Sequence, residues 1–132
     1  MPVQVLWDND DRTTLRYDVQ GHWTWNEFYE NFAHARAMMQ TVPHTVDFIV
    51  NPVDFRSRGY MPSGMISRVV QLYRNIPPNT GVTVIVGGGD FFRIINNVSR
   101  GFYPRIAARY RFTDTLDEAR AVLIKLRENK LT

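Results

Sequence analysis

The fold is decided by residues 82–90, which read Val-Thr-Val-Ile-Val-Gly-Gly-Gly-Asp. Four β-branched aliphatic residues surround Thr83, and this run is the strongest strand signal in the chain. The three glycines predict a tight turn, and Asp90 is expected to cap a helix, because its carboxylate can accept a free N–H at the helix start. A strand that turns directly into a helix indicates an α/β domain with parallel strands.

The same alternation precedes this stretch. Asp47–Val50 predicts a short buried strand, and a helix is expected from Ser63 until Pro77–Gly81 stops it. A further helix is expected to open at Thr24, because Glu27 stands three residues later and the two can form a capping box. Its apolar residues recur every three or four positions, at Trp25, Phe28, Phe32, Ala35 and Met39.

The chain opens with a predicted β-hairpin. Val3–Trp7 and Thr13–Gln20 both alternate apolar and polar residues, and Asp8–Asp11 between them favours a turn. Apolar residues on one face only predict that the other face, which carries Arg16 and its polar neighbours, is in contact with solvent.

Downstream of Asp90 the alternation continues. We expect a third helix with an apolar face at Phe91, Ile94, Ile95 and Val98, and then a loop over Gly101–Arg105. A half-exposed strand over Ala108–Phe112 and a last helix capped by Thr115 and Glu118 complete the chain. The predicted order is β-β-α-β-α-β-α-β-α. It implies one α/β domain over residues 1–132, with four helices on a five-stranded, mixed, mostly parallel sheet.

Composition narrows the class of protein. The chain has 132 residues, a formal net charge of +3 and no cysteine, so disulfides, thiolate metal sites and a cysteine nucleophile are excluded. All but two of the 16 cationic residues are arginine. The opening residues lack the pattern of a signal peptide, and no stretch reaches the roughly 18 apolar residues of a membrane span, so we expect a cytoplasmic protein.

The element order resembles the STAS domain family, the SpoIIAA-like fold of bacterial anti-sigma factor antagonists. Three local stretches carry the resemblance: Trp23–Phe28 before the first helix, Met61–Met65 at the second, and Phe112–Ala119 at the last. Met61-Pro62-Ser63-Gly64-Met65 looks like the phosphorylation motif of the family, although Pro62 replaces its acidic residue. The resemblance implies a regulatory domain that binds a protein partner, such as an anti-sigma-type kinase, without a cofactor.

Ser63 is the first candidate site. A phosphate there would face the free N–H groups of the following helix. The alternative is that Ser63 is only the N-cap of that helix and that Gly64 allows close packing.

Loops that follow parallel strands line the ligand-binding edge of an open sheet. The long segment Asn51–Pro62 and the turn at Gly87–Gly89 should therefore share one edge with Ser63. The segment combines aromatic residues with arginines, which suits binding, although its rings could instead lie under the loop. The candidate partner-binding or ligand-binding residues are Phe55, Arg56, Arg58, Tyr60, Met61, Gly64, Gly88 and Gly89.

Other functions have less support in the sequence. Five arginines between Arg93 and Arg111 alternate with aromatic residues, which could contact a nucleic acid, but no recognised nucleic-acid motif accompanies them. The three histidines lack metal-ligand spacing, and no carboxylate pair is placed for acid–base chemistry. We therefore expect no enzyme and no metal. The first hypothesis is a regulatory protein-binding domain that could also form a homodimer through a sheet edge. The alternative is a domain that binds a small molecule or a lipid headgroup.

Overall fold

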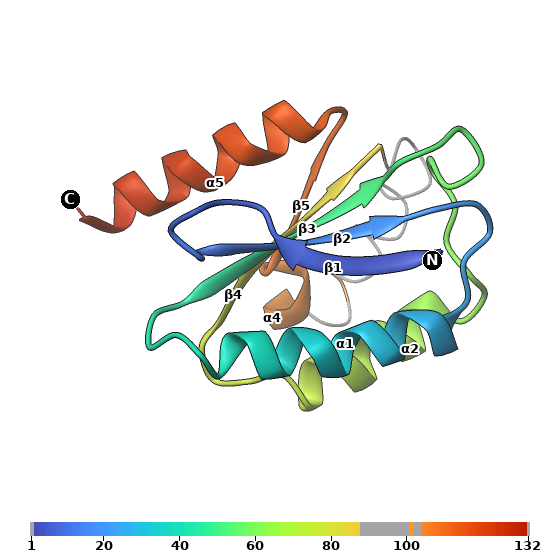
Figure 1. Ribbon diagram of the computed structural model, residues 1–132, viewed down its shortest axis with the longest axis horizontal. Coiled ribbons are helices and arrows are strands. Elements are labelled where there is room, and N and C mark those ends of the chain that lie inside the picture. The colour runs from blue at the N-terminus through green and yellow to red at the C-terminus, as the bar shows by residue number, and fades with distance from the viewer. Residues whose placement is uncertain (1, 88–100, 102–103, 132) are drawn as a thin grey trace.

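A computed structural model of the chain describes residues 2–87, 101 and 104–131. It has the predicted five-stranded mixed sheet, and the first, second and last predicted helices form (Figure 1). In chain order the elements are β1 (Val3–Trp7), β2 (Thr14–Val19), α1 (Trp25–Met39), β3 (Val46–Pro52), α2 (Met65–Arg74), β4 (Thr80–Val86), α4 (Pro104–Ala107), β5 (Tyr110–Thr113) and α5 (Leu116–Leu131).

The five strands form one mixed sheet in the order β1-β2-β3-β4-β5. β1 pairs antiparallel with β2, in a register that places Val3 opposite Val19, so the predicted hairpin is confirmed. The other three pairings, from β2 to β5, are parallel. β1 and β5 are therefore the two edge strands.

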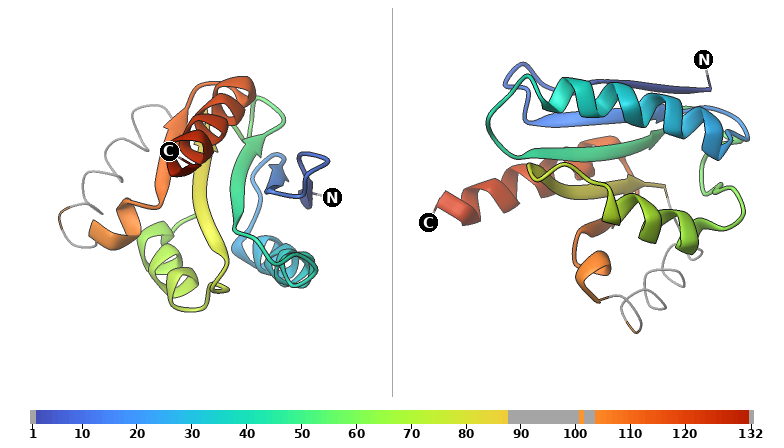
Figure 2. Two further views of the ribbon diagram at one scale, coloured as in Figure 1. Left: turned by 90° about the vertical axis from the view of Figure 1, so that its left-hand side faces the viewer. Right: turned by 90° about the horizontal axis from the view of Figure 1, so that it is seen from below.

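Helices cover both faces of this sheet. α1 and α2 lie on one face and α5 lies on the other (Figure 2). The core on the α1 side consists of Val3, Leu15, Tyr17, Val19, Trp23, Ala35, Met39, Val46 and Phe48. The core under α5 consists of Ile49, Val84, Val86, Ala119 and Leu123.

Local capping signals act as the sequence predicts. The Thr24 hydroxyl accepts a hydrogen bond from the Glu27 N–H, and the Glu27 carboxylate accepts one from the Thr24 N–H. At α5 the Thr115 hydroxyl likewise accepts from the Glu118 N–H. The third predicted helix, with Phe91 to Val98, lies outside the described residues. The short helix α4 forms where the sequence predicted a loop.

The expected solvent-exposed face of the hairpin is instead partly buried, and that prediction was wrong. The Asp8 carboxylate is only 5% exposed and accepts hydrogen bonds from Arg16 Nη1 at 2.6 Å and from Arg120 Nη2 at 2.8 Å. Arg16 also contacts Asp18 at 2.8 Å. The polar residues alternate as they would on a solvated face, but Arg120 of α5 reaches across and pairs with Asp8, 112 positions away.

We expect the free energy of unfolding to fall in acid because of Asp8. Burial of its carboxyl raises the pKa, but hydrogen bonds from Arg120 and Arg16 outweigh burial and hold the pKa below its ordinary value of 3.8. A depressed pKa in the folded state gives stability that is present above about pH 4 and is lost as the pH falls through the folded value. Urea unfolding between pH 7 and pH 3 measures this dependence.

Asp8→Asn is the variant that isolates this carboxylate. It should cost about 2 kcal/mol at neutral pH, less than a fully buried pair, because Arg120 is 40% exposed. The remaining acid dependence should be smaller than that of the wild type. Asp10→Asn, in the same turn but exposed, is the control and should follow the wild-type profile. If the free energy of unfolding of Asp8→Asn falls with pH as steeply as that of the wild type, Asp8 is not the source of the acid dependence.

Candidate functional site

The parallel strands β2, β3 and β4 end at the same edge of the sheet, on the right in Figure 1. We call this edge, with the segments that follow these strands, the carboxyl rim. Its segments contact one another: Trp25 Nε1, at the start of α1, donates to the Ser63 carbonyl at 2.8 Å. Arg58 Nη2 donates to the Asp114 carbonyl at 2.8 Å. The Arg58 side chain also lies against Gly87, where a built Cβ atom would come within 3.0 Å of its Cγ. Ser63, the long loop and the first glycine therefore share this rim, as predicted, whereas Gly88 and Gly89 lie outside the described residues.

Asp54 organises the loop between β3 and α2. Its Oδ1 accepts hydrogen bonds from the Ser57 hydroxyl at 2.7 Å, the Ser57 N–H at 2.9 Å and the Gly21 N–H at 3.1 Å. These bonds, that of the Ser57 hydroxyl first, hold the pKa of Asp54 below its ordinary value. The sequence analysis placed Asp54 and Ser57 in the long loop but missed that they hold its turn, although an Asp followed three positions later by Ser is a recognisable turn signal.

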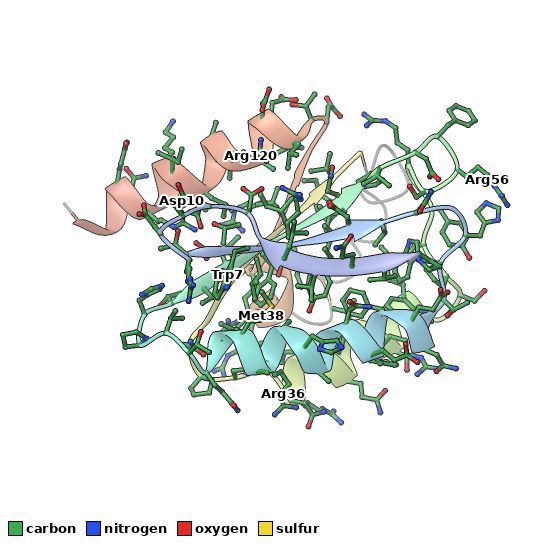
Figure 3. All side chains as sticks on the ribbon, in the orientation of Figure 1. Trp7, Asp10, Arg36, Met38, Arg56 and Arg120 are labelled. Atoms are coloured by element: carbon green, nitrogen blue, oxygen red, sulfur yellow. The ribbon has the colours of Figure 1, made fainter. Side chains whose placement is uncertain are left out.

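The loop fixed in this way presents Phe55 to solvent. The Phe55 side chain is 93% exposed, and Arg56 beside it is exposed as well. Figure 3 shows Arg56 projecting from the end of the molecule at which the rim lies. Val53, the residue that follows β3, is also exposed. An aromatic ring, an aliphatic side chain and a guanidinium are thus exposed within residues 53–56, on a loop whose backbone is held by Asp54.

The other two apolar candidates of the loop are in a different environment. Tyr60 and Met61 are half-buried and pack against the core on the α1 side. The Tyr60 ring stacks on His22 at 4.4 Å between centroids and meets Trp23 edge to face at 6.3 Å. They link the loop to the core and offer only part of their surface to a partner.

The start of α2 differs from the prediction for Ser63. The N-cap is Gly64, with no side-chain cap, and Ser63 precedes it and is exposed. Gly64 has φ = +79°, and no atom lies within 4 Å of the position of an added Cβ. The close-packing explanation for this glycine was therefore wrong. Glycine is needed because the backbone at this position is left-handed, a conformation that residues with a Cβ atom rarely adopt.

Two buried polar atoms lie in the aromatic core behind the rim. Tyr17 Oη and Trp23 Nε1 have no hydrogen-bond partner among the described residues. Both rings contact Phe28, with centroids 4.7 Å and 5.8 Å away. Burial raises the pKa of the Tyr17 hydroxyl, so it stays protonated and can donate. The sequence carries no local signal for this, because tyrosine and tryptophan are also common in apolar cores.

The arginines proposed as a nucleic-acid surface are partly used within the fold. Arg109 Nη1 donates to the Thr80 carbonyl at 3.1 Å, and its guanidinium lies 5.5 Å from the Tyr73 ring centre. Arg111 Nη1 donates to the carbonyls of Ala108 and Tyr110. These contacts fix main-chain and ring groups around β5. Arg93 and Arg100 lie outside the described residues.

The described residues show neither a metal-binding cluster nor a membrane-spanning helix. Within residues 2–87, 101 and 104–131, no group of three or more His, Asp or Glu side chains is placed to hold a metal ion. No helix in the described part of the chain is long and apolar enough to cross a membrane. Comparison of the sequence with protein-family models and with curated proteins finds no match.

Proposed function

We propose that this chain is a non-catalytic regulatory domain of the STAS type that binds a protein partner through the carboxyl rim. The observation that carries the proposal is Phe55, a large apolar side chain held in water. Aromatic and arginine side chains dominate the binding energy of protein interfaces. The order of the elements and the resemblance at Met61–Met65 support the family assignment.

Order in the loop strengthens this argument. An exposed ring on a mobile loop would lose conformational entropy on binding, which weakens affinity. Here the Asp54 carboxylate fixes the turn that carries Phe55, and Arg58 ties the same turn to the Asp114 carbonyl. The binding residues are thus held in place before a partner arrives.

The test is affinity capture from the native host, followed by titration of the purified captured protein. Phe55→Ala should weaken the complex about tenfold or more, as expected for an interface anchor. The free energy of unfolding of the Phe55→Ala chain should stay within about 0.5 kcal/mol of the wild type, because an exposed ring contributes little to folding. Ile124→Ala, which removes an exposed apolar side chain from α5, is the matched control and should bind normally. Equal binding by the Phe55→Ala and wild-type chains would reject the rim as the docking surface.

Ser63 enters this proposal as the residue that regulates docking. It is exposed at the rim, next to the start of an α2 helix that has no side-chain cap. A phosphate on its hydroxyl would add charge close to the N–H groups of that helix. Intact mass measurement of protein isolated from its host under varied growth conditions tests this part, and an unmodified mass throughout would remove it.

A second candidate function is binding of a small molecule or lipid headgroup in the aromatic core behind the rim. The two unpartnered donors, Tyr17 Oη and Trp23 Nε1, favour it. Burying such groups without a hydrogen bond is costly, and a ligand with an acceptor group and an apolar body would offset that cost.

Tyr17→Phe tests whether the hydroxyl is indeed unpartnered. We expect the free energy of unfolding to stay equal or to rise by up to about 1 kcal/mol, because the variant removes a buried polar group that makes no hydrogen bond. Urea unfolding measures it. A loss of 1 kcal/mol or more would mean that the hydroxyl has a partner in the folded chain. Titration of tryptophan fluorescence with oleate, a carboxylate with an apolar chain, should show weaker binding for Tyr17→Phe than for the wild type if the second function holds.

A further inference from the structure

The two edge strands of the sheet are protected to very different degrees. β5 carries an arginine at position 111, whose guanidinium donates hydrogen bonds to main-chain carbonyls at the start of the strand. β1 reads Val-Gln-Val-Leu-Trp and has no charged residue. Natural sheets usually place charges, prolines or bulges on exposed edges, because an unprotected edge pairs with other chains. β1 has none of these protections between Val3 and Trp7.

The pairing with β2 shows which main-chain groups of β1 face outward. The Gln20 N–H donates to the Pro2 carbonyl, and the Asp8 N–H donates to the Thr14 carbonyl, so even-numbered residues of β1 face β2. The main-chain groups of Val3, Val5 and Trp7 therefore point away from the sheet. One of them is used: Asn31 Nδ2 of α1 donates to the Val3 carbonyl at 3.0 Å. Within the described residues, no main-chain group pairs with the outward N–H and C=O of Val5 and Trp7.

Apolar side chains accompany these free groups. Val5, Trp7 and Met38 are partly exposed and pack on the core of the α1 side. β1 runs across the front of the molecule in Figure 3, where Trp7 and Met38 are labelled on the side that faces the viewer. We call the outward edge of β1, with these three side chains, the β1 flank.

Charged side chains lie beyond both ends of β1. The hairpin turn at one end carries two exposed carboxylates, Asp10 and Asp11, beside the exposed Arg12. Arg56 lies on the loop after β3, and Figure 3 shows Asp10 and Arg56 on opposite sides of the molecule. A two-fold axis perpendicular to a strand exchanges its ends, so it would bring the acidic turn of one copy toward the Arg56 end of the other.

We propose that the β1 flank pairs with the β1 flank of a second copy of this chain, antiparallel and centred on Val5. Val5 would exchange both main-chain hydrogen bonds with its counterpart, and Trp7 would lie opposite Val3 of the other copy. The two sheets would become one sheet of ten strands, with the α1 helices adjacent on one face. A flank that is self-complementary in hydrogen bonds, apolar contacts and charge fits a two-fold dimer better than it fits an unrelated peptide. This inference does not depend on the proposed function.

Val5→Pro is the first test, because proline removes only an outward N–H and is tolerated on an edge strand. Sedimentation of the full chain at about 100 µM should give twice the monomer mass of 15.4 kDa, since even a dissociation constant of tens of micromolar gives mostly dimer there. Val5→Pro should give the monomer mass with an unchanged circular dichroism spectrum. A monomeric wild type, or a folded Val5→Pro that stays dimeric, would overturn the proposal.

If Val5→Pro does not fold, a charge swap tests whether the β1 flank is the dimer interface. Asp10→Arg combined with Asp11→Arg should raise the dissociation constant about tenfold, and adding Arg56→Asp should recover most of that loss. All three side chains are exposed, so folding is preserved. Asp117→Arg, at a side chain on α5 that is 95% exposed, is the matched control and should leave the dimer unchanged. Equal effects of the control and the turn variants would exclude the β1 flank as the interface.

Discussion

Asp47→Ala is expected to lower the free energy of unfolding by about 3–5 kcal/mol, because it removes a buried carboxylate that three elements share. Asp47 Oδ2 accepts hydrogen bonds from Arg127 Nη2 at 2.8 Å and Nε at 3.1 Å, which hold α5 on β3. Its Oδ1 accepts from the Val82 N–H of β4 at 2.8 Å. The variant leaves both donors without this acceptor.

The Val82 N–H needs this acceptor because the ladder is irregular at that point. Val46 pairs with Thr80 and Phe48 with Thr83, so two residues of β4 stand opposite the single residue Asp47. Such a bulge takes one N–H out of the strand ladder, and the Asp47 side chain replaces the missing carbonyl.

Urea unfolding of two further variants separates the contribution of the hydrogen bond from Val82 from that of the charge opposite Arg127. Asp47→Asn keeps an oxygen for Val82 but loses the charge opposite Arg127, so its loss should be intermediate. Asp117→Ala, which removes a carboxylate that is 95% exposed, should stay within about 0.5 kcal/mol of the wild type. A loss of less than 1 kcal/mol for Asp47→Ala would show that neither donor depends on this carboxylate.

Much of the fold could be predicted from the sequence because its signals are local. The hairpin depends on the alternation around Asp8–Asp11, and α1 on the capping box of Thr24 and Glu27. The parallel pairing of β3 and β4 follows from their apolar runs and from the helix between them. Each strand and helix is predicted from residues a few positions apart, and the pairing follows from their order along the chain.

The exceptions are contacts between distant parts of the chain. Arg127 and Asp47 are 80 positions apart, and Asp47 could be interpreted only as the first residue of a strand. The polar face of the hairpin has the alternation of a solvated face, and nothing near it shows that Arg120 will cover Asp8. Polar residues that are buried by a distant partner have the same local pattern as exposed ones.

The candidate site shows the same limit. The position of the loop at the carboxyl rim follows from the direction of the parallel strands, and the contacts of Arg58 and Trp25 confirm it. The sequence could not distinguish Phe55, which is exposed, from Tyr60, which packs on the core, because both are aromatic residues of one loop. That difference depends on contacts with a distant part of the chain, because Tyr60 stacks on His22 and packs on Trp23.

Gly81→Ala is expected to destabilise the chain by about 2–3 kcal/mol, through crowding at the same bulge. Gly81 was interpreted as part of a turn that stops a helix, but it lies in β4, directly against the Asp47 side chain. A Cβ there would clash with Asp47 Oδ1 and would come within 2.9 Å of Thr45 Cγ2. The carboxylate cannot move aside easily, because Arg127 and the Val82 N–H both hold it.

A double-mutant cycle between Gly81→Ala and Asp47→Ala tests this explanation. In the Asp47→Ala chain the clashing carboxylate is gone, so adding Gly81→Ala should cost at least 1 kcal/mol less than it does in the wild type. Gly101→Ala, at a glycine with no atom within 4 Å of an added Cβ, is the control and should leave stability unchanged or slightly raised. If the two substitutions add within about 0.5 kcal/mol, the cost of Gly81→Ala arises elsewhere than at Asp47. A coupling of the expected size would identify the absence of a side chain at position 81 as the condition that lets a carboxylate complete the ladder of a bulged strand.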